Sequence, residues 1–157
     1  MDNDYISKMD ELKYLLNNHF QILNTEKIKF NFHKEKDSFA YITGSSAAGH
    51  TISFSKKDYN RMTRNQILGV LSHELAHIYY EKTNGFVFTL FKNILYFSSK
   101  KYKIKEERKV DLIVIKNGCG QYLLEFIKYH DKHYKKYKRT DGLTKKEIKK
   151  ALKKIVG

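Results

Sequence analysis

The sequence predicts a single α+β domain in which a small, mainly antiparallel three-stranded sheet packs with several helices. Two patterns lead to this fold class. Three short segments between residues 27 and 55 alternate apolar and polar residues, as half-buried strands do. The segments on either side repeat their apolar residues every three or four positions, which is the period of an amphipathic helix. A length of 157 residues suits one domain with its own core, so we expect residues 1–157 to form one unit.

The predicted strands follow one another closely in the sequence. In the first strand, Ile28, Phe30 and Phe32 recur at every second position and should face the core. A loop of small residues, Gly44–Gly49, joins the second strand to the third, so these two strands should pair antiparallel. The three expected strands span residues 27–33, 38–43 and 50–55.

Helices are expected on both sides of these strands. The clearest one begins at Thr63, because Thr63 and Gln66 have the spacing of a capping box. Apolar residues then follow at helical spacing as far as Ile78, which predicts a half-buried helix. The expected helices span residues 5–20, 63–82, 105–117 and 120–130, a basic connector covers 100–105, and a last helix follows Thr144.

The helix over residues 63–82 carries the motif His73-Glu74-Leu75-Ala76-His77. Two histidines four residues apart lie on one face of a helix, close enough to bind a single metal ion, and imidazole nitrogens suit Zn²⁺. The glutamate between them lies beside the metal, where it can act as a base towards a bound water. The motif therefore predicts His73 and His77 as zinc ligands and Glu74 as the general base of a hydrolytic reaction.

A catalytic zinc site usually has three protein ligands, so a third must come from elsewhere in the chain. We choose Glu107 because it lies on a helix after the motif, and because Asp111 follows four residues later on the same face. A carboxylate at Asp111 can fix the orientation of a ligand histidine. Other candidate ligands are Glu106, His130 and His133, and either histidine, Tyr129 or Tyr134 is a candidate for stabilising an oxyanion.

Composition restricts the compartment and the partners. The single cysteine, Cys119, excludes an internal disulfide and suits a reducing compartment. We see no secretory signal and no run of the ~20 apolar residues that a transmembrane helix needs, so we expect a cytoplasmic protein. The net charge of +14 favours anionic partners, although a lysine-rich solvated surface explains the same charge. Peripheral contact with an anionic membrane is one expectation, and nucleic acid is a less favoured partner.

The most apolar run of the chain covers residues 86–97. Its length favours a buried helix or hairpin, and an insertion that faces lipid or a partner is the alternative. The residues after His130 are the most basic part, and residues 131–157 form a basic C-terminal segment in which tyrosines alternate with lysines. Such a composition occurs in segments that bind nucleic acid or anionic membranes and in helices with a solvated lysine face.

The stretch from Phe39 to about Ile127 resembles the catalytic domain of gluzincin metallopeptidases. The likeness is to the HtpX-like and CAAX prenyl endopeptidase type and to its small soluble relatives, the minigluzincins of the abylysin and jannalysin type. Their pattern is a rim strand, a small-residue loop, a second strand, H-E-x-x-H and then E-x-x-A-D. Here the last part is Glu107-Arg-Lys-Val-Asp111, with Val110 in place of the usual small residue.

This resemblance implies a zincin-like fold with an active-site helix, a glutamate helix and C-terminal helices. It implies a zinc-dependent metalloendopeptidase that hydrolyses peptide bonds through a zinc-bound water. One Zn²⁺ would be bound by His73, His77 and Glu107, with Glu74 as the catalytic base and acid and Asp111 supporting a ligand histidine. A peptide or protein substrate would bind along the rim strand, whose residues are Phe39, Ala40, Tyr41, Ile42 and Thr43.

The chain also departs from the pattern. Asp37 stands where the family often has asparagine two residues before the rim-strand phenylalanine. Integral-membrane members carry transmembrane hairpins where this chain has only the 86–97 run, so the resemblance implies a soluble or peripheral form. Minigluzincins can be latent, with their own C-terminal segment over the cleft, and the segment 131–157 would have that place here.

Two alternatives remain at the level of the sequence. One is a latent or non-catalytic zinc-binding domain whose basic C-terminal segment binds anionic membrane or nucleic acid. The other is a regulatory peptidase of the ImmA type, which also combines H-E-x-x-H with a later glutamate. The residues from Phe39 to Gly44 fit the HtpX-like pattern better than the ImmA type.

Overall fold

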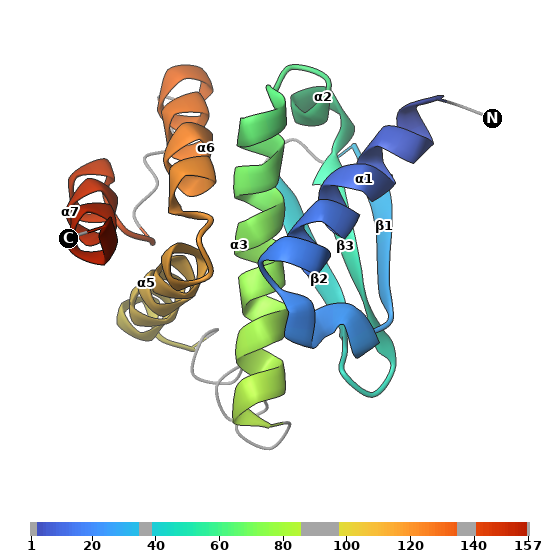
Figure 1. Ribbon diagram of the computed structural model, residues 1–157, viewed down its shortest axis with the longest axis horizontal. Helices are drawn as coiled ribbons and strands as arrows, with labels where there is room; N and C mark the ends of the chain where they lie inside the picture. The colour runs from blue at the N-terminus through green and yellow to red at the C-terminus, as the bar shows by residue number, and fades with distance from the viewer. Residues whose placement is uncertain (1–2, 35–38, 86–97, 135–140, 157) are drawn as a thin grey trace.

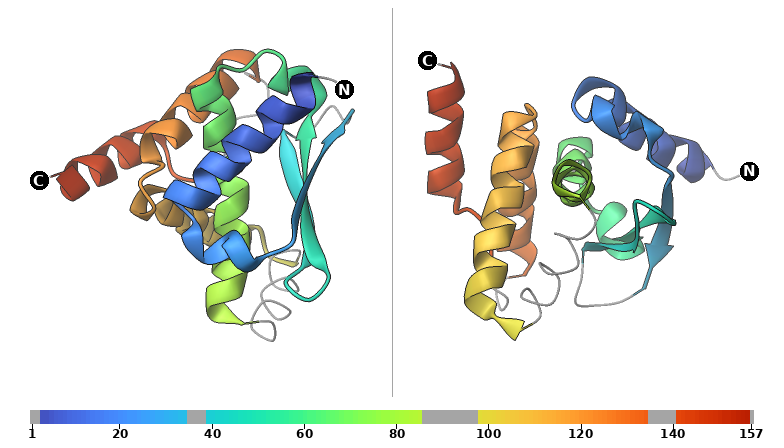
Figure 2. Two further views of the ribbon diagram at one scale, coloured as in Figure 1. Left: turned by 45° about the vertical axis from the view of Figure 1, so that its right-hand side comes forward. Right: turned by 90° about the horizontal axis from the view of Figure 1, so that it is seen from below.

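A computed structural model describes residues 3–34, 39–85, 98–134 and 141–156 of the chain. Helix α3 runs through the middle of the molecule, with the sheet and α1 on one side and α5 and α6 on the other (Figure 1). Seen from below, α7 is the outermost element on the α5–α6 side (Figure 2). The described elements, in chain order, are α1 (Asn3–Asn18), the 3₁₀ helix η1 (Gln21–Thr25), β1 (Ile28–His33), β2 (Ala40–Ser45), β3 (Gly49–Ser55), α2 (Lys56–Tyr59), α3 (Arg64–Asn84), α5 (Lys100–Lys116), α6 (Gly120–His133) and α7 (Lys145–Val156).

The predicted α+β class with a three-stranded sheet is confirmed, but the sheet is mixed and not mainly antiparallel. Its strand order is β1-β3-β2. β2 and β3 pair antiparallel, as the small-residue loop between them predicts, whereas β1 and β3 pair parallel. The reason is that the chain reverses direction after β1 and again after β2, so β3 runs the same way as β1 when it lies between the two.

Helix α3 is buried on several sides because elements cover it from both directions. Its buried residues extend from Ile67 to Ile78 and include Leu71 and Leu75, each no more than 1% exposed. Gly69 lies against α6, where a side chain would overlap the backbone of Tyr122. The helix that carries the motif is thus a central packing element, and its side chains have little freedom to move.

Apolar side chains hold the layers together on both sides of α3. Towards the sheet, the core contains Leu15, Phe20 and Leu23 from α1 and the turn after it, together with Ile52 and Phe54 of β3. On the other side, α5 and α6 contribute residues that are likewise buried, namely Val110, Val114, Leu123, Phe126 and Ile127. α7 adds Ile148, which is fully buried.

The prediction of a basic connector over residues 100–105 is wrong, because these residues form the first turns of α5. The side chain of Ser99 accepts a hydrogen bond from the backbone N–H of Tyr102 and so caps the helix. Lysine is a good helix former, and its charge alone does not end a helix. Gly118, with a φ of 79°, ends α5 at the predicted place.

Two sequence predictions lie outside the described residues. These are the buried or lipid-facing role of the 86–97 run and most of the basic run that follows His133. In the parts of the chain that the structure describes, no helix is both long enough and apolar enough to span a bilayer.

Candidate metal centre

The local structure of α3 sets the direction of the motif side chains. Thr63 and Gln66 form the predicted capping box, with a bond of 2.9 Å from the Thr63 backbone N–H to the Gln66 side chain. The helix then continues unbroken through the motif. His73 and His77 therefore lie one turn apart on the same face, with their ring centroids 5.0 Å apart.

Helix α5 brings a carboxylate to this pair. The Nε2 atom of His73 lies 3.1 Å from Oε2 of Glu107, and Nε2 of His77 lies 3.7 Å from Oε1 of the same side chain. One nitrogen from each histidine and one carboxylate oxygen all lie within 4.8 Å of one another. Glu107 is 34 residues away from His73 in sequence, so the group exists only because α5 packs against α3.

Asp111 lies one turn further along α5 and contacts the other nitrogen of His73. Its side chain is fully buried, and Oδ1 lies 3.0 Å from Nδ1 of His73. An ionised carboxylate can only accept hydrogen bonds, so Nδ1 is the donor. This contact fixes the tautomer and the ring orientation of His73 and directs Nε2 towards Glu107.

The electrostatics of the group follow from its burial. Burial disfavours the charged form of His73, but hydrogen bonds to Asp111 and Glu107 outweigh it and raise the pKa of His73 to about 10. Burial alone would raise the pKa of Glu107, but its hydrogen bonds with His73 and His77 hold that pKa well below its usual range. The carboxylates on either side of His73 therefore favour a positive charge at the centre of this group.

Glu74 is buried beside these residues. Burial raises the pKa of its carboxyl group, and the charges of His73 and His77 oppose this shift while that of Glu107 adds to it. Glu74 follows His73 directly on α3 and is 9% exposed. A carboxyl group in such surroundings takes up a proton more readily than one in water.

The donor set fits a metal ion. Two imidazole nitrogens and one carboxylate oxygen are the ligands of many hydrolytic zinc sites, which leave a fourth position for water or substrate. His73 also has the carboxylate partner on its second nitrogen that metal-binding histidines usually have. His73, His77 and Glu107 would thus hold the ion, with Asp111 behind one of them.

The comparisons with known proteins agree with this chemistry. The sequence model of peptidase family M48 matches residues 9–127, which is most of the 157-residue chain and includes all four of these residues. The chain belongs to peptidase family M48. Its function is accordingly that of a metallopeptidase. Neither the comparison with curated proteins nor that with solved structures finds a match.

In this family M48 chain, the residues predicted for the substrate rim lie at the start of β2. Ala40 to Thr43 belong to β2, which is at the edge of the three described strands, and Phe39 immediately precedes it. The ring of Phe39 packs against α6 and the residue that follows it, with ring centroids 5.3 Å from Phe126 and 4.4 Å from Tyr134. The rim strand is therefore anchored at one end to the helical side of the molecule.

The other candidate ligands of this M48 peptidase lie outside the His73–His77–Glu107 group. Glu106 turns away from the histidines and pairs with Lys109 at 2.6 Å. His130 stacks on Tyr134, and the ring of His133 lies tilted against Tyr129 with centroids 4.4 Å apart. Among the described residues, the metal-binding group that the structure brings together contains neither histidine.

The two tyrosines predicted as oxyanion candidates both donate to a buried carboxylate that sequence analysis did not single out. The Tyr129 hydroxyl lies 2.9 Å from Oδ1 of Asp58, and the Tyr134 hydroxyl lies 2.8 Å from Oδ2. Ser55 donates a further bond to Asp58 and caps α2. The Ser-x-x-Asp spacing from Ser55 to Asp58 signals a helix start, but nothing local signals the two tyrosines.

Proposed function

We propose that the chain is a zinc-dependent endopeptidase of the gluzincin type. The observation that carries this proposal is the convergence of His73, His77 and Glu107, whose ligand atoms lie within 4.8 Å of one another, in a chain of a peptidase family. When bound, zinc would polarise the scissile carbonyl group and lower the pKa of a water molecule. The spacing of Glu107 and Asp111 further supports a relative of the HtpX-like type and of the minigluzincins.

Glu74 is the proposed general base and acid. Its carboxyl group is buried next to the histidines, where burial raises its pKa. In this proposal the carboxylate accepts the proton of the attacking water and then passes it to the nitrogen of the leaving amine. His73 does not take part in this proton transfer, because its Nδ1 proton is held by Asp111.

The proposed substrate is an extended peptide that adds to the edge of β2. The backbone N–H of Ser55 donates to the carbonyl of Phe39 at 2.7 Å, so these residues form a hydrogen-bonded pair across β2 and β3. Residues of an antiparallel strand alternate in direction, and the backbone groups of Ile42 are therefore turned away from β3. A peptide strand could pair with them while its side chains alternate between the site and solvent.

The first experiment is to measure zinc per chain after dialysis, together with hydrolysis of a mixture of internally quenched peptides. One zinc per chain and hydrolysis that a chelator abolishes and zinc restores would support the proposal. Hydrolysis that continues unchanged in the metal-free protein would contradict it. So would a purified chain that neither retains nor takes up zinc.

Latency of the full-length chain is a separate proposal. It predicts that a chain without residues 141–157 hydrolyses peptides faster than the full chain when both are saturated with zinc. Equal rates for the two zinc-saturated chains would contradict latency.

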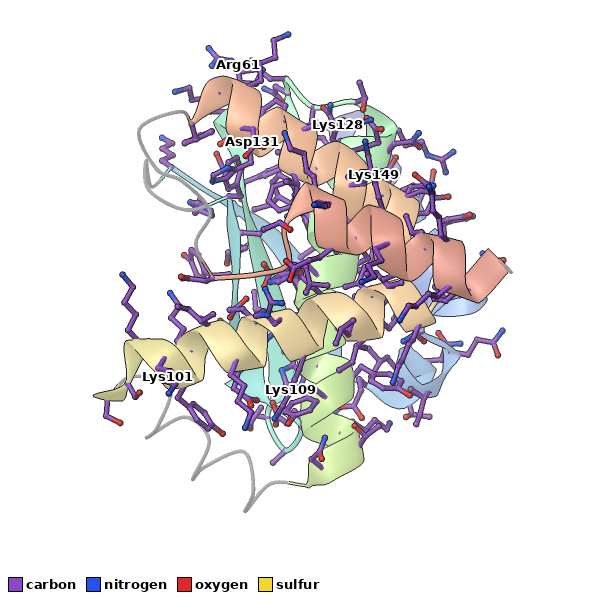
Figure 3. All side chains as sticks on the ribbon, turned by 90° about the vertical axis from the view of Figure 1, so that its left-hand side faces the viewer. Arg61, Lys101, Lys109, Lys128, Asp131 and Lys149 are labelled. Atoms are coloured by element: carbon purple, nitrogen blue, oxygen red, sulfur yellow. The ribbon has the colours of Figure 1, made fainter. Side chains whose placement is uncertain are left out.

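The basic face of the molecule carries a proposal about partners. Lysines of α5, α6 and α7, among them Lys101, Lys128 and Lys149, lie on the side of the molecule drawn in Figure 3. The lysines of α7 are exposed, whereas Ile148 is buried. We expect binding to vesicles that contain anionic lipid, weakening as salt increases. Equal binding to neutral vesicles would contradict an electrostatic contact. Preferential binding to nucleic acid would mean that nucleic acid, and not a membrane, is the partner.

A further inference from the structure

The segment just before α7, residues 141–144, is bound to α5 at several points. Asp141 pairs with Lys103 at 2.9 Å, and the carbonyl of Gly142 accepts a bond from Arg108. Arg108 also binds the carboxylate of Glu147 with both of its terminal nitrogens, one of them at 3.2 Å from Oε2. The segment 141–144 therefore lies against α5, the helix that carries Glu107 and Asp111.

One further contact of this segment reaches the candidate metal centre. The backbone N–H of Leu143 donates to Oδ2 of Asp111 at 2.7 Å, and both groups are buried. The other oxygen of the same carboxylate, Oδ1, accepts from Nδ1 of His73 at 3.0 Å. Asp111 thus joins Leu143 to His73 through two hydrogen bonds, one on each of its oxygens.

We propose that the segment 141–144 is a positioning element of the metal centre. The backbone N–H of Leu143 holds the Asp111 carboxylate in the orientation that keeps Nε2 of His73 directed at Glu107. The inference rests on the proposed zinc site and adds to it a contribution from outside the matched family region, which ends at residue 127.

The chemistry of the link requires a carboxylate at residue 111. An ionised carboxylate accepts on both oxygens, whereas an amide has one accepting oxygen and one donating nitrogen. An amide at this position would have to place its NH₂ group against either the N–H of Leu143 or the Nδ1–H of His73. If the NH₂ group faced His73, the imidazole would move its proton to Nε2, the atom that the metal needs.

This role differs from that of a cover over the cleft. A segment that only covers the cleft can be removed without loss of metal binding. A segment that holds Asp111 cannot, because its removal leaves a buried carboxylate oxygen without the Leu143 N–H. Zinc affinity therefore distinguishes the two roles without any peptide substrate.

The test is zinc affinity of the full chain, measured by competition with a chromophoric chelator. Leu143→Pro removes the backbone N–H, and Leu143→Ala keeps it while removing most of the buried side chain. We expect Leu143→Ala to bind zinc within about 3-fold of wild type. Leu143→Pro should bind roughly 10-fold more weakly, because it loosens Asp111, and outright loss of such a partner of a metal ligand weakens binding about 10- to 100-fold. Equal affinities for the two variants would overturn the proposal.

A double-mutant cycle tests the link itself and separates it from general damage to the fold. Asp111→Asn should weaken zinc binding by roughly 10- to 100-fold in the wild-type background. In the Leu143→Pro background, Asp111→Asn should lower zinc affinity much less. The single amide oxygen can then face His73, while the NH₂ group lies where the Leu143 N–H was. If the fold-losses of zinc affinity in the two single variants multiply to give the loss in the double variant, the proposal is overturned.

A gentler variant covers the case in which Leu143→Pro does not fold. Glu147→Gln weakens the attachment of α7 to Arg108 on α5, and Lys145→Gln weakens its ion pair with Asp131 on α6. We expect zinc affinity to fall at least 3-fold in the first variant and to stay unchanged in the second, the matched control. Equal zinc affinity of Glu147→Gln and wild type would overturn the positioning role alone. Failure of wild type to bind zinc would overturn the proposed function as well.

Discussion

Glu106 and Glu107 are adjacent in sequence but turn to different sides of α5. Glu107 contacts the two motif histidines, whereas Glu106 is fully buried and pairs with Lys109. Lys109 in turn lies within 3.4 Å of the Tyr80 hydroxyl on α3. The two acids therefore belong to different contacts between the same two helices.

This difference gives a matched pair of variants. Glu107→Gln should lower zinc affinity at least about 100-fold, because the amide is a neutral and weaker ligand than the carboxylate. Glu106→Gln should leave zinc affinity within about 3-fold of wild type, since its side chain faces Lys109. Metal competition assays on both variants provide the measurement. Similar losses in both would mean that the zinc site is not built as proposed.

Glu74→Gln should separate metal binding from catalysis. The amide keeps the size of the side chain but cannot accept a proton at neutral pH, so kcat should fall by roughly 10²- to 10⁴-fold. Zinc content should remain at the wild-type value, because the side chain does not belong to the His73–His77–Glu107 group. Metal analysis and peptide hydrolysis on the same preparation check both statements. Loss of zinc from this variant would contradict the role of Glu74 as a base.

Gly69→Ala should destabilise the fold although alanine favours helices. A β-carbon at Gly69 would overlap the carbonyl oxygen of Tyr122 and lie 2.8 Å from Cβ of Phe126. The helix propensity of alanine gives about 1 kcal/mol, and we expect the overlap to exceed it, with a net loss of about 1–3 kcal/mol. Thermal or denaturant unfolding would measure this loss.

Gly85→Ala is the control for this substitution. Gly85 has open space around its α-carbon but a φ of +83°, so its cost of about 1–2 kcal/mol would come from the backbone alone. Zinc affinity should be unchanged in this control. A rise in the unfolding temperature of Gly69→Ala would contradict this prediction, because it would mean that α3 and α6 can move apart without a loss of stability.

The attachment of α7 should weaken in acid. Hydrogen bonds from Arg108 and Thr144 lower the pKa of Glu147 to about 2, below its ordinary value of 4.5. The pair therefore stabilises the folded chain fully above about pH 4.5, and this contribution is lost as the pH falls from 4.5 towards 2. Solvent screens this half-exposed pair, so it should contribute no more than about 1 kcal/mol.

The measurement is the difference in unfolding free energy between wild type and Glu147→Gln across this pH range. The difference should be largest near neutral pH and should approach zero near pH 2. Added salt should reduce it as well. A difference that does not change with pH would mean that the Arg108–Glu147 ion pair does not stabilise the fold.

The parts of the molecule that the sequence predicted well depend on local patterns. The capping box at Thr63 and the helical spacing that follows it are contained within one helix, and α3 forms as expected. The same holds for the antiparallel pair of β2 and β3, which are joined by a short loop. The parallel pairing of β1 was missed because it depends on the position that β3 takes between two earlier strands.

The candidate site shows the same division. Glu107 could be chosen from its spacing to Asp111, and the structure brings it to the histidines. The bond from Leu143 to Asp111 had no sequence signal, because a backbone N–H is present in every residue except proline. Tyr129 and Tyr134 had a recognisable chemistry, but their partner Asp58 lies more than 70 residues away in sequence.

The close contact between Gly69 and the backbone of Tyr122 also has a consequence for the dynamics of the molecule. Backbone contact at this point holds α6 against α3, and the bonds from Tyr129 and Tyr134 to Asp58 hold the C-terminal end of α6 against α2. β2, by contrast, lies at the edge of the described sheet, and its residues are half-buried or exposed. In a hydrogen-exchange experiment, the amides of α3 and α6 should exchange last and those of β2 much earlier. We therefore expect the helix that carries the motif to be the stable part of the site and the rim strand to be its mobile part.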